Sequence, residues 1–326
     1  MDDLNARLAA GATPPLRTIF MGTPEIAVPL FEALIQDELI TVDAVVSQPD
    51  RPAGRGRRMT APAVVQAARS DQIPVHQPER LRDVRSELEE LQPDLLVVMA
   101  YGKILPGWLL DLPRIAPLNV HASLLPRHRG ASPIQSAILA GDEQTGVSLM
   151  AMTPEMDAGP VLCTRSIPIT DDDDAGRLHD AIARLAAEMW PEASARLVAG
   201  TLQACPQDDE AATYCRKLTP ADRRIDWSRP AVEIARQVRA FSPRPGASTT
   251  LAGQPLKILA GTVAPSVAAE QLAPGQIVAV DPDGIAVATG DGVYRVRRLQ
   301  SAGGRPLSVG DWLRGHALRP GARLGE

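Results

Sequence analysis

Residues 18–47 have the sequence TIFMGTPEIAVPLFEALIQDELITVDAVVS, in which two short apolar runs flank a segment with apolar positions three and four residues apart. The runs predict strands at 18–21 and 42–47, and the spacing between them predicts a helix at 27–36. A helix between two strands carries the chain back, so that the second strand lies parallel to the first. The stretch therefore predicts an α/β fold.

The same alternation continues as far as residue 200. Further strands are predicted at 95–100, 118–122, 146–152 and 160–169, and further helices at 61–70, 84–91 and 175–198. The last helix follows an acidic run at 171–174 that is suited to cap its amino end, and Gly200 ends it. This order predicts a Rossmann-like, mostly parallel sheet with helices on both faces, and ligands of such sheets bind beyond the carboxyl ends of the strands.

The pattern changes after residue 200. Residues 201–222 lack regular periodicity and are expected to be a linker, and a helix is predicted at 231–240. Short strand candidates, broken by Gly and Pro, follow at 247–251, 256–260, 275–280, 284–289 and 292–299. They predict a small β-barrel of the oligonucleotide-binding type. The expected domains are a polar extension at 1–15, an α/β domain at 16–200, the linker at 201–222 and the barrel domain at 223–326.

The composition is that of an ordinary soluble globular protein, since 44% of the 326 residues are hydrophobic and 22% are charged. No apolar stretch approaches the roughly 18 residues that a membrane helix needs, and the amino terminus lacks the apolar core of a signal peptide. The three cysteines, Cys163, Cys205 and Cys215, have no metal-ligand spacing and cannot all pair. We therefore expect a cytoplasmic protein without a membrane partner.

Charge is unevenly distributed along the chain, whose formal net charge is -5. Residues 216–326 carry 16 Lys and Arg against 9 Asp and Glu, whereas residues 1–215 carry 18 against 30. A basic carboxyl-terminal third on an acidic body indicates that a polyanion is bound at one end. A surplus of solvated arginine explains the same counts, so charge alone leaves both interpretations open.

Asn119, His121 and Asp157 are candidates for catalysis. Alternate residues of a strand point to the same face, so Asn119 and His121 are expected side by side near the carboxyl end of the strand at 118–122. An amide donates to a developing oxyanion, an imidazole donates to it or moves a proton, and a carboxylate orients that imidazole. With Asp157, the set suits transfer of an acyl-type group through a tetrahedral intermediate.

Each of these residues also has a simpler explanation. A single His on a strand is often a hydrogen-bonded structural residue, and an Asp before Ala and Gly often forms a turn. Other chemistry is disfavoured by the motifs that the chain lacks. The glycine-rich dinucleotide motif and the phosphate-binding loop of nucleotide hydrolases are absent, and the five His residues lack metal-binding spacing, so no metal is assigned.

A basic loop follows the strand at 42–47. It places four arginines among Pro and Gly, namely Arg51, Arg55, Arg57 and Arg58. Loops that leave such strands overhang the ligand crevice, and guanidinium groups suit contacts with phosphate. An ordinary solvated basic loop is the alternative interpretation.

Five stretches of the chain resemble the methionyl-tRNA formyltransferases, members of the folate-dependent formyltransferase superfamily. They are FMGTPEIAVPLFEAL at 20–34, SQPDRPAGRGRRM at 47–59, MAYGKILP at 99–106, the stretch at 118–162 that begins LNVHASLLPRHRG, and RRIDWS at 223–228. The resemblance extends from about residue 16 to near the carboxyl terminus. The basic carboxyl-terminal domain and the arginine loop favour this family over the single-domain purine enzyme and the amino-sugar enzymes of the superfamily.

The resemblance implies that 10-formyltetrahydrofolate donates its formyl group to the α-amino group of methionine on initiator tRNA. By motif, Asn119, His121 and Asp157 are the implied catalytic set. The folate site is implied to be lined by Ser123, Leu124, Leu125 and Pro126, with Tyr101, Gly102 and Ile104 beside it. The arginine loop is implied to reach the tRNA acceptor arm, chiefly through Arg55, and the barrel domain to hold the tRNA.

One position departs from the family, because His128 stands where a Tyr or Trp is usual, which affects the packing beside the folate loop more than the reaction. We expect a monomer. The alternatives are an amino-sugar formyltransferase, a hydrolase that releases formate from 10-formyltetrahydrofolate, or a tRNA-binding protein without activity. The intact Asn119, His121 and Asp157 argue against the last of these.

Overall fold

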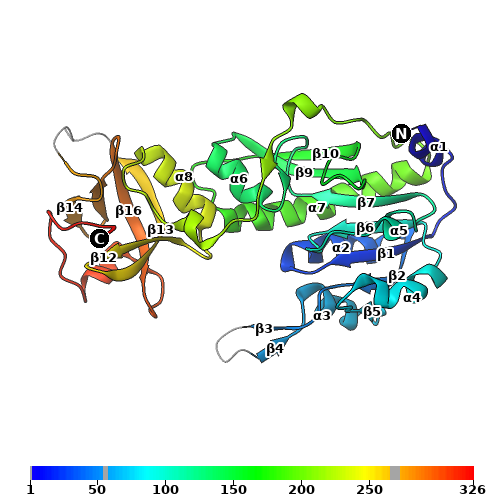
Figure 1. Cartoon of the computed structure of the whole chain (residues 1–326), viewed down its shortest axis with the longest axis horizontal. Coiled ribbons are helices and arrows are strands. Elements are labelled where there is room, and N and C mark those ends of the chain that lie inside the picture. The colour runs from blue at the N-terminus through cyan, green and yellow to red at the C-terminus, as the bar shows by residue number, and fades with distance from the viewer. Residues whose placement is uncertain (1, 54–57, 265–271) are drawn as a thin grey trace. The chain divides into compact units, whose positions relative to one another are not determined.

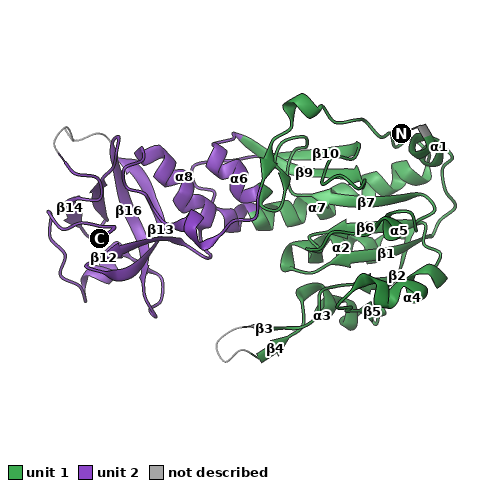
Figure 2. Ribbon diagram, in the orientation of Figure 1, with its two compact units in different colours: residues 1–133, 144–167, 179–215 green, residues 134–143, 168–178, 216–326 purple. Residues whose placement is uncertain are grey.

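The computed structural model describes residues 2–53, 58–264 and 272–326 (Figure 1). The chain forms two compact units, which Figure 2 draws in different colours. Unit 1 contains residues 1–133, 144–167 and 179–215, and unit 2 contains residues 134–143, 168–178 and 216–326.

Strands and helices alternate through the first part of the chain, as the sequence predicts. The strands are β1 (Leu16–Gly22), β2 (Ile40–Val46), β3 (Arg51–Ala53), β4 (Arg58–Thr60), β5 (Val75–His76), β6 (Leu95–Met99), β7 (Ala116–His121), β8 (Arg129–Gly130), β9 (Gln144–Ala151), β10 (Val161–Pro168) and β11 (Tyr214–Cys215). The α-helices are α1 (Asp2–Ala9), α2 (Val28–Gln36), α3 (Ala63–Ser70), α4 (Arg85–Glu90), α5 (Gly107–Leu110), α6 (Pro133–Ala140) and α7 (Ala175–Val198). Short 3₁₀ turns are η1 (Glu25–Ala27), η2 (Leu81–Val84) and η3 (Asp209–Ala211).

The main sheet has seven strands in the order β10-β9-β7-β6-β1-β2-β5. Strand β1 pairs in parallel with β2 and β6, and β7 is parallel to β6 but antiparallel to β9. The predicted Rossmann-like, mostly parallel sheet is therefore confirmed. The chain adds β2 on one side of β1 and β6 on the other, so the strand order reverses between β1 and β6, the place where such sheets bind ligands at their carboxyl edge.

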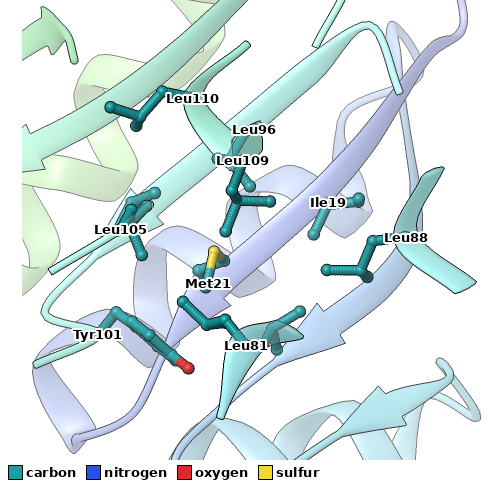
Figure 3. Packing of buried hydrophobic residues seen from close by; sticks show 11 residues of the cluster. Ile19, Met21, Leu81, Leu88, Leu96, Tyr101, Leu105, Leu109 and Leu110 are labelled. Carbon is teal, nitrogen blue, oxygen red and sulfur yellow. The ribbon is translucent and has the colours of Figure 1, made fainter. Parts of the chain in front are cut away.

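Side chains of β1 alternate between the two faces of this sheet. Met21 belongs to a buried apolar cluster on one face, together with Leu88 of α4 and Leu109 of α5 (Figure 3). Phe20 points to the opposite face, where its ring centroid lies 5.4 Å from that of Phe31 in α2. Helices therefore cover both faces and bury the apolar strands between them.

The helix predicted at 175–198 is observed as α7 with the same bounds. Oδ1 of Asp174 accepts a hydrogen bond of 2.9 Å from the Arg177 amide and so caps its amino end. Gly200 follows with a φ of 69°, a left-handed conformation that glycine takes without the strain of a Cβ. Trp190 of α7 is 1% exposed, and its Nε1 donates to Asp37 after α2 at 3.0 Å, which fixes α7 beside α2.

The carboxyl-terminal strands of unit 2 are β12 (Ala247–Leu251), β13 (Gln254–Ala264), β14 (Ile277–Asp281), β15 (Gly284–Ala288), β16 (Val293–Ser301) and β17 (Leu307–Ser308). Its later helices are η4 (Pro220–Arg223), α8 (Ala231–Phe241) and α9 (Val309–Leu313). The antiparallel sheet has the order β12-β13-β16-β15-β14, with β17 on β16. Arg323 bridges to Gln276 before β14, and Leu324 bridges to Leu251 in β12, so the end of the chain joins the two edge strands. The sequence predicts a small β-barrel domain of the oligonucleotide-binding type after the α/β domain, and a carboxyl-terminal domain of short antiparallel strands is observed there.

The segments at 1–15 and 201–222, expected to be a polar extension and a linker, both pack against the rest of the chain. The polar segment at 1–15 contains helix α1, in which Leu8 is 1% exposed and the Asn5 side chain accepts a hydrogen bond of 3.0 Å from the Ala204 amide. Residues 201–222 divide between the two units after Cys215. Across the part of the chain that the structure describes, no helix combines the length and apolarity needed to cross a lipid bilayer.

Candidate active site

Asn119 and His121 lie near the carboxyl end of β7 and are 9% and 7% exposed. In the pairing with β9, Asn119 stands opposite Met150 and His121 stands opposite Ser148. Alternate residues of one strand, and residues paired across two strands, share a face of the sheet. The amide and the imidazole therefore point to the same face.

The imidazole of His121 has two polar neighbours. Its Nε2 lies 2.9 Å from the carbonyl oxygen of His128, and its Nδ1 lies 3.7 Å from Oδ2 of Asp157. Because a carbonyl oxygen only accepts, Nε2 carries the hydrogen and donates it. In the neutral ring Nδ1 is then unprotonated and faces the carboxylate. Nδ1 is therefore the ring nitrogen that is able to accept a proton from a substrate.

Asp157 lies in the loop between β9 and β10, and its carboxylate is fixed by a main-chain contact. Oδ2 accepts a hydrogen bond of 2.8 Å from the Gly130 amide, and the side chain is 17% exposed. The φ of Asp157 is 53°, in the left-handed region that Asp adopts more readily than most residues. The residue is therefore both a turn former and the carboxylate that faces His121.

Gly130 is positioned by a two-stranded parallel sheet in which β8 pairs with β11. Gly130 stands opposite Cys215 and has a φ of 117°. A Cβ at this position would lie 2.2 Å from the carbonyl oxygen of Cys215. The close approach of the two backbones therefore requires glycine, and it sets the amide that holds Asp157.

The side-chain amide of Asn119 makes no hydrogen bond to any residue within the described ranges. Nearly buried amides are usually paired inside a protein, because an unmatched donor or acceptor there is unfavourable. An amide that is left free beside His121 is available to donate to an oxygen of a substrate.

The segment implied to line the folate site follows β7 directly. Ser123 is 0% exposed, and its hydroxyl donates to the Arg127 carbonyl at 2.6 Å, so it closes a turn. From β9, the Ser148 hydroxyl donates to the Ser123 carbonyl at 2.8 Å and accepts from the Leu125 amide at 3.0 Å. The half-buried side chains of the segment, which remain accessible to a ligand, are those of Leu124, Leu125 and Pro126.

The second implied folate segment follows β6. The ring of Tyr101 is 2% exposed and packs in the apolar cluster with Met21 and Leu81 (Figure 3). Burial raises the pKa of Tyr101 to about 12, and its hydroxyl has no hydrogen-bond partner among the residues that the structure describes. Gly102 has a φ of 85°, and Ile104 is 93% exposed. This segment therefore offers a ligand its backbone and Ile104 rather than the tyrosine ring.

The arginine loop is described only at its two ends. Arg51 lies in β3 and Arg58 lies in β4, which pair as an antiparallel hairpin, and both side chains are exposed. Arg55 and Arg57 lie outside the described residues. Exposed guanidinium groups on a hairpin are suited to contacts with phosphate.

Our reading of the sequence missed four groups that shape the site. They are the carbonyl of His128, the amide of Gly130, the hydroxyl of Ser148 and the side chain of Gln207. Ser148 could have been found, because pairing the strands predicted at 118–122 and 146–152 places it near His121. His128 acts on His121 through its backbone, so the departure from the family at this position leaves that contact unchanged.

The described residues contain no group of three or more His, Cys, Asp or Glu side chains that could hold a metal ion. The three cysteines are free thiols. Cys215 is 7% exposed, and its Sγ lies 3.4 Å from the His128 carbonyl oxygen, so it packs behind the site. The site places the imidazole of His121 beside the carboxylate of Asp157, with the side-chain amide of Asn119 on the same strand face as the imidazole.

Known proteins resemble the chain along almost its whole length. The formyl transferase model matches residues 16–194, and the formyl transferase, C-terminal domain model matches residues 217–317. Methionyl-tRNA formyltransferase of Halorhodospira halophila is 46% identical over 306 residues, which cover 94% of this chain and 98% of that protein. The chain belongs to the methionyl-tRNA formyltransferase family. Another member, from Stutzerimonas stutzeri, is 47% identical over 318 residues, 96% of this chain and 100% of that protein.

Solved structures share the fold of this methionyl-tRNA formyltransferase family member at lower identity. The N-formyltransferase from Helicobacter canadensis, in complex with folinic acid and dTDP-3-aminofucose, has a TM-score of 0.65 at 17% identity and covers 86% of this chain and 98% of that chain. HypX from Aquifex aeolicus in complex with tetrahydrofolic acid has a TM-score of 0.61 at 18% identity and covers 95% of this chain and 51% of that chain. These likenesses show the fold, and the family itself indicates a folate-type formyl donor.

Proposed function

We propose that this chain transfers the formyl group of 10-formyltetrahydrofolate to the α-amino group of methionyl initiator tRNA. The observation that carries the proposal is the similarity to relatives named methionyl-tRNA formyltransferase, which reaches 46% identity over 94% of the chain and spans both matched domains. The products are formylmethionyl-tRNA, which starts translation, and tetrahydrofolate.

The nucleophile in this reaction needs little activation. An α-amino group titrates near 7.7 to 8.0 in reference compounds, and the adjacent ester of an aminoacyl-tRNA lowers that value further. Much of the amine is therefore neutral near pH 7 and able to attack the formyl carbon. The protein has to position the two substrates, stabilise the oxyanion that develops and remove one proton.

Asn119 is the oxyanion donor in this proposal. Its amide is nearly buried and has no partner among the described residues, so it is free to bind the formyl oxygen as negative charge develops there. A donor that is already in place gains strength in the transition state without reorganising.

His121 and Asp157 take the proton that leaves the amine. The hydrogen on Nε2 is directed to the His128 carbonyl at 2.9 Å, which leaves Nδ1 as the accepting nitrogen. Oδ2 of Asp157, 3.7 Å from Nδ1, stabilises the imidazolium that results. When the tetrahedral intermediate collapses, the imidazolium returns this proton to the folate nitrogen whose bond to the formyl carbon breaks, and tetrahydrofolate leaves. From the sequence, the imidazole of His121 suits either donation to the oxyanion or movement of a proton, and its contact with the His128 carbonyl favours proton removal.

The substrates are assigned to three further parts of the chain. The folate donor is proposed to lie against Leu124, Leu125 and Pro126, with Gly102 and Ile104 beside it. The tRNA acceptor arm is proposed to meet the arginines of the loop, Arg51, Arg55, Arg57 and Arg58. Residues 216–326, with 16 Lys and Arg against 9 Asp and Glu, are proposed to hold the body of the tRNA through phosphate contacts. We further propose that the protein acts in the cytoplasm as a monomer.

The proposal is tested by offering purified protein and 10-formyltetrahydrofolate to three acceptors: methionyl initiator tRNA, methionyl elongator tRNA and a nucleotide-linked amino sugar. Formylated product and free formate are followed in each reaction. We expect rapid formylation of the initiator tRNA alone. A formylated sugar with unmodified tRNA would identify an amino-sugar formyltransferase, and formate without any formylated acceptor would identify a hydrolase.

A further inference from the structure

Gln207 reaches the loop of Asp157 from a segment that the sequence suggests is a linker. In the structure it belongs to unit 1. Its Nε2 donates to the main-chain carbonyl of Asp157 at 2.9 Å and to that of Gly159 at 2.6 Å. Both hydrogens of one amide are therefore used to hold the turn that carries the Asp157 carboxylate.

Arg129 fixes the orientation of that amide. Its Nε donates to Oε1 of Gln207 at 3.0 Å. A guanidinium only donates and a main-chain carbonyl only accepts, so the Gln207 amide satisfies its three neighbours in a single orientation. The opposite orientation sets an NH₂ group against Arg129 and an oxygen against two carbonyls.

Arg129 is itself fixed by its other neighbours. It is 2% exposed, and its terminal nitrogens donate to Asp209 at 2.7 Å and to the Tyr214 hydroxyl at 3.2 Å. Its guanidinium carbon also lies 5.9 Å from the centroid of the Tyr214 ring. Burial acts to lower the pKa of Arg129, but hydrogen bonds to Asp209 and Tyr214 outweigh it and raise that pKa. A cation held by this many partners is a firm support for Gln207.

Asp157 is thereby held at two points. Gln207 binds its carbonyl, and the Gly130 amide binds its carboxylate at 2.8 Å. Its φ of 53° is a left-handed conformation that costs some energy even for Asp, and these contacts hold the residue in it. Together the two contacts direct the carboxylate towards Nδ1 of His121, 3.7 Å away.

We propose that Gln207 is a positioning residue for the transfer reaction, oriented by Arg129 and acting through Asp157. This assignment rests on the proposed function, in which Asp157 stabilises the proton accepted by His121. Gln207 makes its contacts with the backbone of the turn rather than with the reacting atoms. Its loss should therefore lower kcat and leave KM unchanged for both substrates.

The first test compares Gln207→Glu with Gln203→Glu. The former keeps the size of the side chain and an acceptor for Arg129, but it removes both donors and places a negative charge against two carbonyls. We expect kcat to fall about 10- to 100-fold with unchanged KM values. Gln203 is exposed in the same segment, so the same chemical change there should leave kcat at the wild-type value. An unchanged kcat in Gln207→Glu would overturn the proposal, because its contact with Arg129 survives in that variant.

A double-mutant cycle tests whether the effect passes through Asp157. Asp157→Asn removes the carboxylate charge, and in that background Gln207→Glu should change the single-turnover rate by less than about two-fold. Equal losses in the two backgrounds would contradict a route through Asp157. Thermal unfolding of each variant identifies any loss of rate that comes from unfolding.

Amide hydrogen exchange needs no substrate, so it separates the failure of this inference from the failure of the proposed function. Gln207→Glu should exchange faster than the wild type over residues 153–159, and Gln203→Glu should not. Unchanged exchange in Gln207→Glu would contradict the proposal that Gln207 stabilises the turn of Asp157, whether or not the protein transfers a formyl group. If exchange rises as expected but the wild type transfers no formyl group, the proposed function fails and the hold on Asp157 stands.

Discussion

Replacing Gly130 with alanine perturbs the contact that fixes the Asp157 carboxylate. The added Cβ would lie 2.2 Å from the Cys215 carbonyl oxygen, whereas ordinary contact begins at 3.4 Å. The two backbones must therefore separate by about 1.2 Å, the difference between these distances. The Gly130 amide moves with its backbone, which disturbs the hydrogen bond of 2.8 Å that it donates to Asp157.

A displacement of this size decides the expected loss of activity. Misplacing a group in an active site by about 1 Å costs on the order of 100-fold in rate. We therefore expect Gly130→Ala to lower kcat for formyl transfer about 100-fold. The KM values for the folate donor and the tRNA should stay near those of the wild type, because Asp157 contributes after binding.

The assay is a single-turnover measurement of formylated tRNA with both substrates saturating. Gly303→Ala is the control, because Gly303 also has a positive φ, 71°, while a Cβ there meets nothing within 4 Å. That variant should retain the wild-type rate. A Gly130→Ala protein that folds normally and transfers formyl at the wild-type rate would refute the role given to the Gly130 amide.

Three other predictions concern the neighbouring parts of the molecule. Tyr101→Phe removes a buried hydroxyl that has no partner among the described residues. We therefore expect the variant to unfold at a temperature equal to or above that of the wild type, with an unchanged KM for the folate donor. A raised KM would indicate that the hydroxyl contacts the donor. Hydrogen bonds from Arg216 and Thr219 hold the pKa of Asp222 below its ordinary value of about 3.9. The ionised carboxylate of Asp222 therefore stabilises the fold fully above about pH 4, and this contribution is lost as the pH falls further. Asp222→Asn should unfold at a lower temperature than the wild type at pH 7, and the difference between the two unfolding temperatures should shrink below about pH 4. A difference that does not change with pH would contradict this. Arg55→Ala should raise the KM for tRNA, leave that for folate unchanged and reduce the slope of log affinity against log salt by about 1; an unaltered slope would argue against a phosphate contact.

Local patterns were enough to predict most of the fold. The bounds of α7 follow from helical periodicity, an acidic cap at Asp174 and a stop at Gly200, all of which lie within or beside the helix. The shared face of Asn119 and His121 follows from the two-residue period of a strand. Helix α1 was missed because its segment is polar, and its buried Leu8 gains its packing only in the folded chain.

The support around the site could not be predicted because it joins distant segments. The Gly130 amide contacts a residue 27 positions away, and Gln207 contacts Asp157 across 50 positions. No periodicity in the sequence encodes such pairs, which depend on how β8, β11 and the loop after β9 meet. Tyr101 illustrates a different limit, because an aromatic residue after an apolar strand suits a ligand site and a core equally well, and here it lies in the core.

The most direct measurement is the single-turnover rate at which formylmethionyl-tRNA is formed from 10-formyltetrahydrofolate and methionyl initiator tRNA, compared between the wild type and Asn119→Ala. We predict that the wild type forms the product and that Asn119→Ala slows the step about 100- to 1000-fold, the usual effect of losing an oxyanion donor. Equal rates for the two proteins, or no formylated tRNA from the wild type, would contradict the mechanism proposed for Asn119, His121 and Asp157.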